Sequence, residues 1–183
     1  MLESDNVFIQ RLADGQTVCK IGDFDDAVPC ATDNKALTAN VGTPGFMAPE
    51  CISRKKGRGS KMLRYDERAD IFSFGMMLFE LLSGELPYAR VHMLDVHDHV
   101  AAGKRPEWPE HFALPDIDKP DWARDSSTLP LSQLVELHLG CTRLEPESRP
   151  LITDIVDLLK KIWFREVERE EKEAALMMRR PVK

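Results

Sequence analysis

The chain of 183 residues lacks the long apolar run that a membrane-spanning helix requires. Its most apolar stretch, residues 71–82, is interrupted by Ser73 and Glu80, whereas a span needs about 20 mostly apolar residues in a row. The first six residues, Met-Leu-Glu-Ser-Asp-Asn, are acidic and contain no apolar signal core. We therefore expect no membrane segment and a cytoplasmic location.

Patterns that bind metals or form disulfides are also absent. His92, His97 and His99 do not follow His-Glu-x-x-His, which favours solvent-facing side chains over a metal site. No Cys-x-x-Cys occurs, so we expect reduced thiols rather than a disulfide framework or a zinc site. The cysteines are few and widely spaced: Cys19, Cys30, Cys51 and Cys141.

Positive charge is in deficit, because the net charge is −6. This gives no reason to expect a nucleic-acid partner, and the one basic run, residues 54–61, is expected to be a solvated loop. The hydrophobic content of 43% is enough for the core of one domain.

The strongest positive signal is the segment Asp70–Gly84, whose apolar residues surround a helical wheel. A helix that is apolar on every side belongs inside a domain. Asp70 stands at the position of an N-cap, and Gly84 at the position of a C-terminal stop. The pattern predicts a buried central helix.

Shorter elements are predicted on both sides of this helix. Val7–Ile9 and Val18–Ile21 are β-prone runs separated by a turn sequence, Ala13–Gln16, and indicate a hairpin. Trp108 and Trp122 are expected to pack in an ordered loop. The expected helices cover residues 91–102, 131–141 and 152–162, and a charged helical extension covers residues 165–183.

Four motifs in a fixed order carry a family resemblance. They are Lys-Ile-Gly-Asp-Phe-Asp at 20–25, Gly-Thr-Pro-Gly-Phe-Met-Ala-Pro-Glu at 42–50, Asp-Ile-Phe-Ser-Phe-Gly at 70–75, and Leu-Glu-Pro-Glu-Ser-Arg-Pro at 144–150. Together they resemble the C-terminal lobe of a protein kinase, with counterparts of Asp-Phe-Gly and Ala-Pro-Glu. The resemblance implies a mainly α fold, with residues 1–164 as the lobe and residues 165–183 as the extension.

The resemblance also implies roles for particular residues. Asn6 and Asp23 match the ligands of the magnesium that bridges nucleotide phosphates. Thr43 matches the supporting threonine of serine/threonine kinases, and its Gly-Thr-Pro-Gly-Phe context resembles the tyrosine-kinase-like group, particularly leucine-rich-repeat and Roco kinases. Glu50 is implied to pair with Arg149. The remaining expectations are that Asp70 holds the catalytic loop and that Thr32 and Thr38 are phosphosites.

Three positions depart from the family pattern. Met1 occupies the place of the catalytic aspartate, Glu3 that of the catalytic-loop lysine, and Asp25 that of a glycine. A thioether cannot accept a proton, and Glu3 places negative charge where phosphoryl transfer needs positive charge. Aspartate tolerates left-handed backbone geometry better than most residues, so Asp25 is expected to let the loop form.

The Gly-x-Gly-x-x-Gly loop and the strand lysine are missing from the sequence, so the chain offers half a nucleotide site. We expect a fragment that joins an N-lobe in cis and acts on protein substrates with ATP and Mg²⁺ in the complete kinase, while binding neither cofactor alone. The alternatives are a pseudokinase-like scaffold or allosteric module, and a truncated chain with little function of its own.

Overall fold

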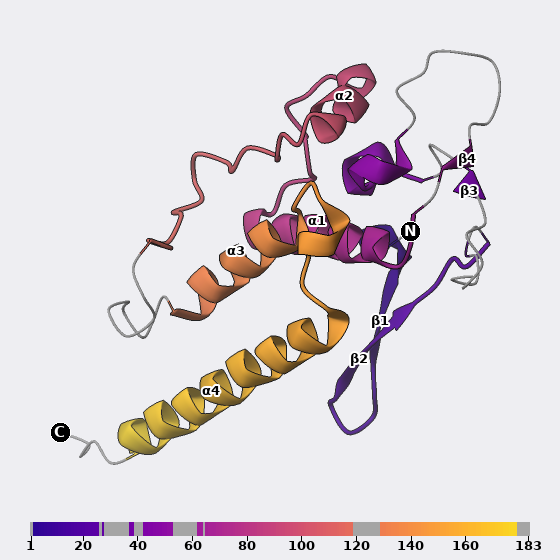
Figure 1. Ribbon diagram of the computed structural model, residues 1–183. Coiled ribbons are helices and arrows are strands. Elements are labelled where there is room, and N and C mark those ends of the chain that lie inside the picture. Colours follow the sequence, from indigo (N-terminus) through magenta and orange to yellow (C-terminus); the bar gives the residue numbers. More distant parts are fainter. Residues whose placement is uncertain are drawn as a thin grey trace. The chain divides into compact units, whose positions relative to one another are not determined.

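The computed structural model describes residues 2–25, 27, 37–38, 42–52, 62–63, 65–118 and 129–178. It divides into two units, Met1–Arg149 and Pro150–Lys183, which are described separately. Helices dominate and a small antiparallel sheet lies near the N-terminus, which confirms the predicted fold class (Figure 1).

The predicted hairpin is present. Strand β1 (Val7–Arg11) pairs antiparallel with β2 (Thr17–Ile21), and Val7 lies opposite Ile21. The Asp14 carboxylate accepts a hydrogen bond from the Gln16 backbone N–H at 3.0 Å. Gly15 has φ +85°, a conformation that glycine adopts without steric cost. A second pairing, of β3 (Leu37–Thr38) with β4 (Met62–Leu63), joins two loops that carry no strand signal.

Helix α1 (Arg68–Ser83) is the central helix, and it ends at Gly84, whose left-handed φ of 72° matches the predicted stop. The predicted N-cap is wrong, because Asp70 lies inside the first turn. Instead, the Asp66 carboxylate accepts a hydrogen bond from the Arg68 backbone N–H at 3.0 Å. Asp66, two residues before Arg68, therefore satisfies the first free N–H group of the helix.

One side of α1 packs on the segment around the Ala-Pro-Glu motif, which also packs on α2 (Val96–Ala101), and all three share one buried cluster. The Ser73 hydroxyl donates to the Phe46 carbonyl at 2.8 Å and fixes the helix against that segment. The buried cluster contains Phe46, Met47, Ala48, Cys51, Ile52, Phe72, Met76, Tyr88, Val96, Val100 and Ala101.

The other side of α1 packs on α3 (Leu129–Cys141). At Gly75 the two backbones approach so closely that an added Cβ would lie 2.7 Å from the Cys141 Cβ. The His138 Nδ1–H donates to the Gly75 carbonyl at 2.9 Å, because a carbonyl can only accept. Trp108 packs within 4.7 Å of the Phe79 ring centroid, whereas Trp122 lies outside the described residues.

The helix expected over residues 91–102 is shorter than predicted. A 3₁₀ turn at Met93–Asp95 leads into α2, and Gly103 follows with φ +71°. His92 is exposed as expected, but His97 and His99 are half-buried, and the His97 Nε2 atom is fully buried. Within the described ranges, no group of three or more His, Cys, Asp or Glu side chains could hold a metal ion.

In the second unit, α4 (Ile152–Met178) runs without a break across the boundary expected at residues 164–165. Arg169 forms ion pairs with Glu166 at 2.6 Å and Glu173 at 2.9 Å, which are helical i,i+3 and i,i+4 pairs. Among the described helices, none is both long and apolar enough to cross a bilayer.

Candidate functional site

The hairpin brings Asn6 and Asp23 to its open end. Asn6 directly precedes β1, and Asp23 follows β2 by two residues. The Gly22 N–H donates to the Asn6 carbonyl at 2.8 Å, which extends the ladder by one step and places residues 6 and 22 beside each other. An amide oxygen and a carboxylate, both hard donors, therefore lie on neighbouring backbones, and this donor set suits Mg²⁺.

Glu3, at the position of the family lysine, contacts Asn6 directly. The Asn6 side-chain NH₂ donates to the Glu3 carboxylate at 3.4 Å, and the Asn6 backbone N–H donates to the Glu3 carbonyl at 3.1 Å. Both contacts span the 3₁₀ turn Ser4–Asn6. A negative charge thus lies against one of the two expected metal ligands.

The left-handed residue in this loop is Asp23. Its φ is +57°, whereas Asp25 is not among the described residues with positive φ. The tolerance of aspartate for left-handed geometry is thus used at position 23 and not at position 25. Of the non-glycine residues, aspartate and asparagine visit this region most easily, so the residue type at 23 suits its backbone.

Arg149 and Glu50 form a bidentate pair, with the Nη1–Oε1 distance at 2.6 Å and the Nη2–Oε2 distance at 2.8 Å. The Arg149 side chain is completely buried and that of Glu50 is 17% exposed. The guanidinium also lies 5.1 Å from the Phe72 ring centroid. Its other hydrogen bonds go to the carbonyls of Arg68, Arg143 and Leu144, so all five N–H donors are used.

For the other expected site residues, the structure gives position or exposure and, within its described part, no contact that identifies a role. Thr43 is exposed and precedes the 3₁₀ turn Pro44–Phe46, and Asp70 is exposed in the first turn of α1. Thr38 belongs to β3. Met1 and Thr32 lie outside the described residues. The roles given to these residues stay predictions.

Buried thiols lie close to this core. Burial raises the pKa of the Cys51 thiol to about 12, and the neighbouring Glu50 carboxylate adds to the effect. Burial likewise raises the pKa of Cys141 to about 12, while Cys19 on the hairpin is exposed. Two of the described cysteines are thus held as neutral thiols, which do not act as nucleophiles.

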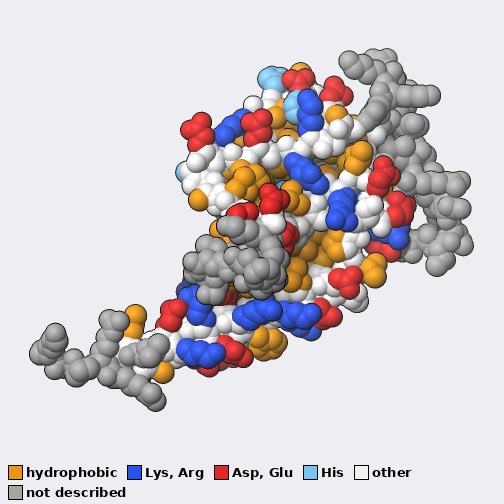
Figure 2. All heavy atoms as spheres, turned by 60° about the vertical axis from the view of Figure 1, so that its left-hand side comes forward, with side chains coloured by type: hydrophobic (Ala, Val, Ile, Leu, Met, Phe, Trp, Pro, Cys, Tyr) orange, Lys and Arg blue, Asp and Glu red, His pale blue; other side chains and the backbone are white. Residues whose placement is uncertain are grey.

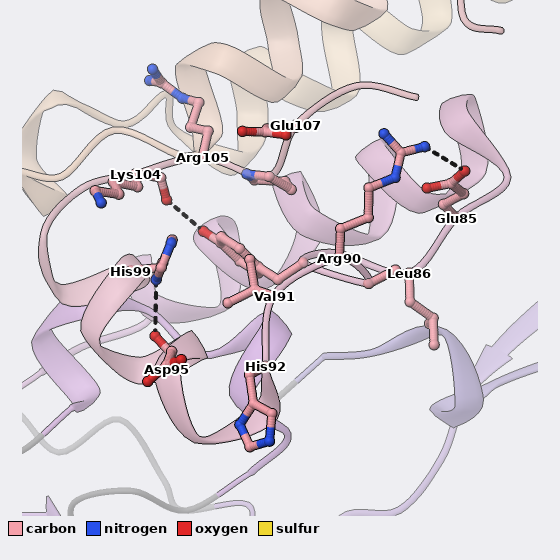
Figure 3. Close-up of a pocket in the computed structure, with 13 residues that line it drawn as sticks. Glu85, Leu86, Arg90, Val91, His92, Asp95, His99, Lys104, Arg105 and Glu107 are labelled. Atoms are coloured by element: carbon pink, nitrogen blue, oxygen red, sulfur yellow. Dashed lines mark hydrogen bonds and ion pairs between the residues drawn. The ribbon is translucent and has the colours of Figure 1, made fainter. Parts of the chain in front are cut away.

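A separate hollow of about 700 Å³ lies between the α1–α2 connection and the segment Lys104–Glu107 (Figure 3). Tyr88 lines it in a left-handed conformation with φ +61°, and its hydroxyl donates to the Lys104 carbonyl at 2.7 Å. The charged side chains that line the hollow are three basic and three acidic: Arg90, Lys104, Arg105, Glu85, Asp95 and Glu107. Because these charges balance, the hollow selects no ligand by net charge.

The surface charge is mixed in the same way. Figure 2 shows acidic and basic side chains interspersed over the face in view. The described part of the face in view therefore carries no broad basic surface of the kind that binds nucleic acid, as expected for a net charge of −6.

The arrangement is that of a protein-kinase C-terminal lobe: a buried central helix, an Ala-Pro-Glu segment fixed by a buried arginine, and a hairpin that carries oxygen donors. A family model described as "Protein kinase domain" matches residues 2–164. The chain belongs to the protein kinase family.

Three curated relatives show the level of similarity. The chain is 34% identical to serine/threonine-protein kinase STY17 of Arabidopsis thaliana over 88% of its length and 24% of that protein. It is 29% identical to leucine-rich repeat serine/threonine-protein kinase 1 of Mus musculus, over 89% of its length and 7% of that protein. It is 36% identical to serine/threonine-protein kinase STY46 of Arabidopsis thaliana, over 68% of its length and 21% of that protein. The chain thus spans about a quarter or less of these relatives.

Sequence reasoning missed two structural features of the lobe. The contact of His138 with the Gly75 carbonyl joins α1 to α3, and the strained backbone of Tyr88 shapes the hollow. The first had a weak signal, because a histidine on the apolar side of a helix needs a polar partner. The second had none, because Pro-Tyr is compatible with ordinary backbone angles.

Proposed function

We propose that this chain is part of a serine/threonine protein kinase that transfers a phosphoryl group from ATP to protein hydroxyls in the complete protein. The observation that carries the proposal is the placement of Asn6 and Asp23 on adjacent backbones at the open end of the hairpin. Membership of the kinase family and the serine/threonine kinases among its relatives support the reaction class.

Asn6 and Asp23 would hold the metal ion through an amide oxygen and a carboxylate oxygen. ATP with Mg²⁺ supplies the transferable phosphoryl group in this family. The ion pair of Glu50 with Arg149 would hold the Ala-Pro-Glu segment in place. Thr43, seven residues before Glu50, would then be fixed near the substrate hydroxyl. Phosphorylation of Thr32 or Thr38 would act on the same segment.

The hairpin also supports an N-lobe in cis as the missing half of the site. Val7, Ile9, Cys19 and Ile21 share one face of the two strands, as their register requires. A two-stranded hairpin is marginal in water unless its apolar face is covered. On this face Ile9 and Ile21 are more than half exposed, at 70% and 57%.

The second candidate function is a pseudokinase-like scaffold. It is favoured by Glu3, whose carboxylate lies against Asn6 where the family has a lysine. Negative charge at this point opposes the γ-phosphate, and Met1 cannot orient a substrate hydroxyl.

One assay separates the two functions. The product of the complete reading frame and this chain alone are incubated with Mg-ATP and a serine/threonine peptide library, and transfer is measured by mass spectrometry. We expect transfer by the complete protein, loss of transfer in its Asp23→Asn variant, and none by this chain alone. Absence of transfer by a folded complete protein that binds ATP would reject the kinase proposal in favour of the scaffold.

A further inference from the structure

The Glu3 carboxylate at the family's lysine position has a structural partner, and this partner is Asn6. The side-chain NH₂ of Asn6 donates to Glu3 at 3.4 Å, and the backbone turn between them is closed by a 3.1 Å hydrogen bond. Both side chains are half-buried. A lysine could not make this contact, because an ammonium group has no acceptor.

The contact fixes which end of the Asn6 amide is free. An asparagine side chain presents an oxygen at one end and an NH₂ at the other, and only the oxygen can bind a cation. Because the Asn6 NH₂ faces Glu3, the amide oxygen points away from Glu3. The Asn6 main-chain carbonyl accepts a hydrogen bond from the Gly22 N–H within the ladder, and we take the side-chain oxygen as the ligand that Asn6 offers beside Asp23.

We propose that Glu3 is a positioning residue, which holds the Asn6 amide with its oxygen directed to the cation site. The inference rests on the proposed role of Asn6 and Asp23 as metal ligands. Hydrogen bonds that orient a metal ligand raise its basicity, and their loss weakens metal binding by about 10–100-fold. At a position where the family has a lysine suited to phosphate, this chain has a carboxylate that orients a metal ligand.

The test uses nuclear magnetic resonance on the whole chain with Mn²⁺ as the probe ion. In the wild type we expect the Asn6 side-chain amide signals to be displaced from those of solvated asparagine. This chain alone is not expected to hold Mg²⁺ stably, but we expect transient occupancy by Mn²⁺ to broaden the signals of Asn6, Gly22 and Asp23 before others. Paramagnetic broadening reports weak occupancy, so the test does not require tight binding or nucleotide.

Three variants separate the possible roles of Glu3. Glu3→Ala and Glu3→Lys are expected to shift the Asn6 amide signals to solvated values and to raise the Mn²⁺ concentration needed for broadening by about 10–100-fold. Glu3→Gln keeps an acceptor oxygen and is expected to lie between these variants and the wild type. Glu110→Gln, which removes an exposed carboxylate elsewhere, is the matched control.

Failure of the positioning role and failure of the metal site give different results. Equal broadening in the wild type and Glu3→Ala overturns the positioning role and leaves the ligand assignment of Asn6 and Asp23 in place. Absence of broadening at Asn6 and Asp23 in the wild type removes the proposed metal site and the positioning role with it. A Glu3→Lys variant that binds Mn²⁺ as well as the wild type also overturns the inference.

Discussion

Removal of the Glu50 carboxylate is the sharpest perturbation of this lobe, because it leaves the buried Arg149 charge with its carbonyl partners but without the carboxylate that neutralises it. The Arg149 side chain has no exposed surface, and it contacts both carboxylate oxygens of Glu50, at 2.6 and 2.8 Å. Breaking a buried pair by removing one partner costs about 3–5 kcal/mol. For a chain of this size that corresponds to a fall in Tm of about 6–20 °C.

The assay is thermal and denaturant unfolding of Glu50→Ala, with Arg169→Ala as the control. Arg169 also meets two carboxylates at short distances, Glu166 at 2.6 Å and Glu173 at 2.9 Å, but all three side chains are solvent-accessible. Exposed pairs contribute little, because water screens both charges. We therefore expect Arg169→Ala to unfold close to the wild type.

A double variant, Glu50→Ala with Arg149→Met, completes the test. It removes the stranded charge, so it is expected to be more stable than Glu50→Ala alone. The reasoning is refuted if Glu50→Ala and Arg169→Ala have the same midpoint of unfolding, since burial would then make no difference.

Three further outcomes are expected. Gly75→Ala places a Cβ 2.7 Å from the Cys141 Cβ and should lower stability by about 1–3 kcal/mol in denaturant unfolding, and an unchanged midpoint would refute the close approach of α1 and α3. Burial lowers the pKa of His138 from 6.5 to about 4, so as the pH falls the unfolded chain protonates this imidazole before the folded chain does. The free energy of unfolding should therefore be full above about pH 6.5 and fall by about 3 kcal/mol towards pH 4. Acid unfolding of His138→Phe should show a flatter pH dependence over this range. Iodoacetamide at about pH 8 should modify Cys19 and spare Cys51 and Cys141, as peptide mapping by mass spectrometry would show, and rapid modification of Cys51 in the folded chain would contradict its burial.

Patterns that depend on local chemistry were predictable. The apolar residues of α1 identified a buried helix, Gly84 identified its end, and the β-prone runs identified the hairpin, because each feature follows from neighbouring residues. The pair of Glu50 with Arg149 joins residues 99 positions apart and entered only through the family resemblance.

Features that depend on tertiary placement were not predictable from the sequence. The hydrogen bond from the Arg68 N–H to Asp66 could not be told from a cap at Asp70, because only the start of the helix decides which aspartate lies near the free N–H groups. The short β3–β4 ladder pairs residues without a strand pattern. The contact of Glu3 with Asn6 needs a specific 3₁₀ turn, which no periodicity signals.

The central claim is that this chain contributes one half of an ATP site, and a thermal shift with Mg-ATP tests it most directly. A ligand present at 100 times its Kd stabilises its target by about 2.7 kcal/mol, which for this chain length raises Tm by about 5–10 °C. We expect no saturable shift up to about 1 mM Mg-ATP, a range in which a complete site with a Kd of about 10 µM would show the full effect. A saturable rise in Tm that Asp23→Asn abolishes would contradict the claim.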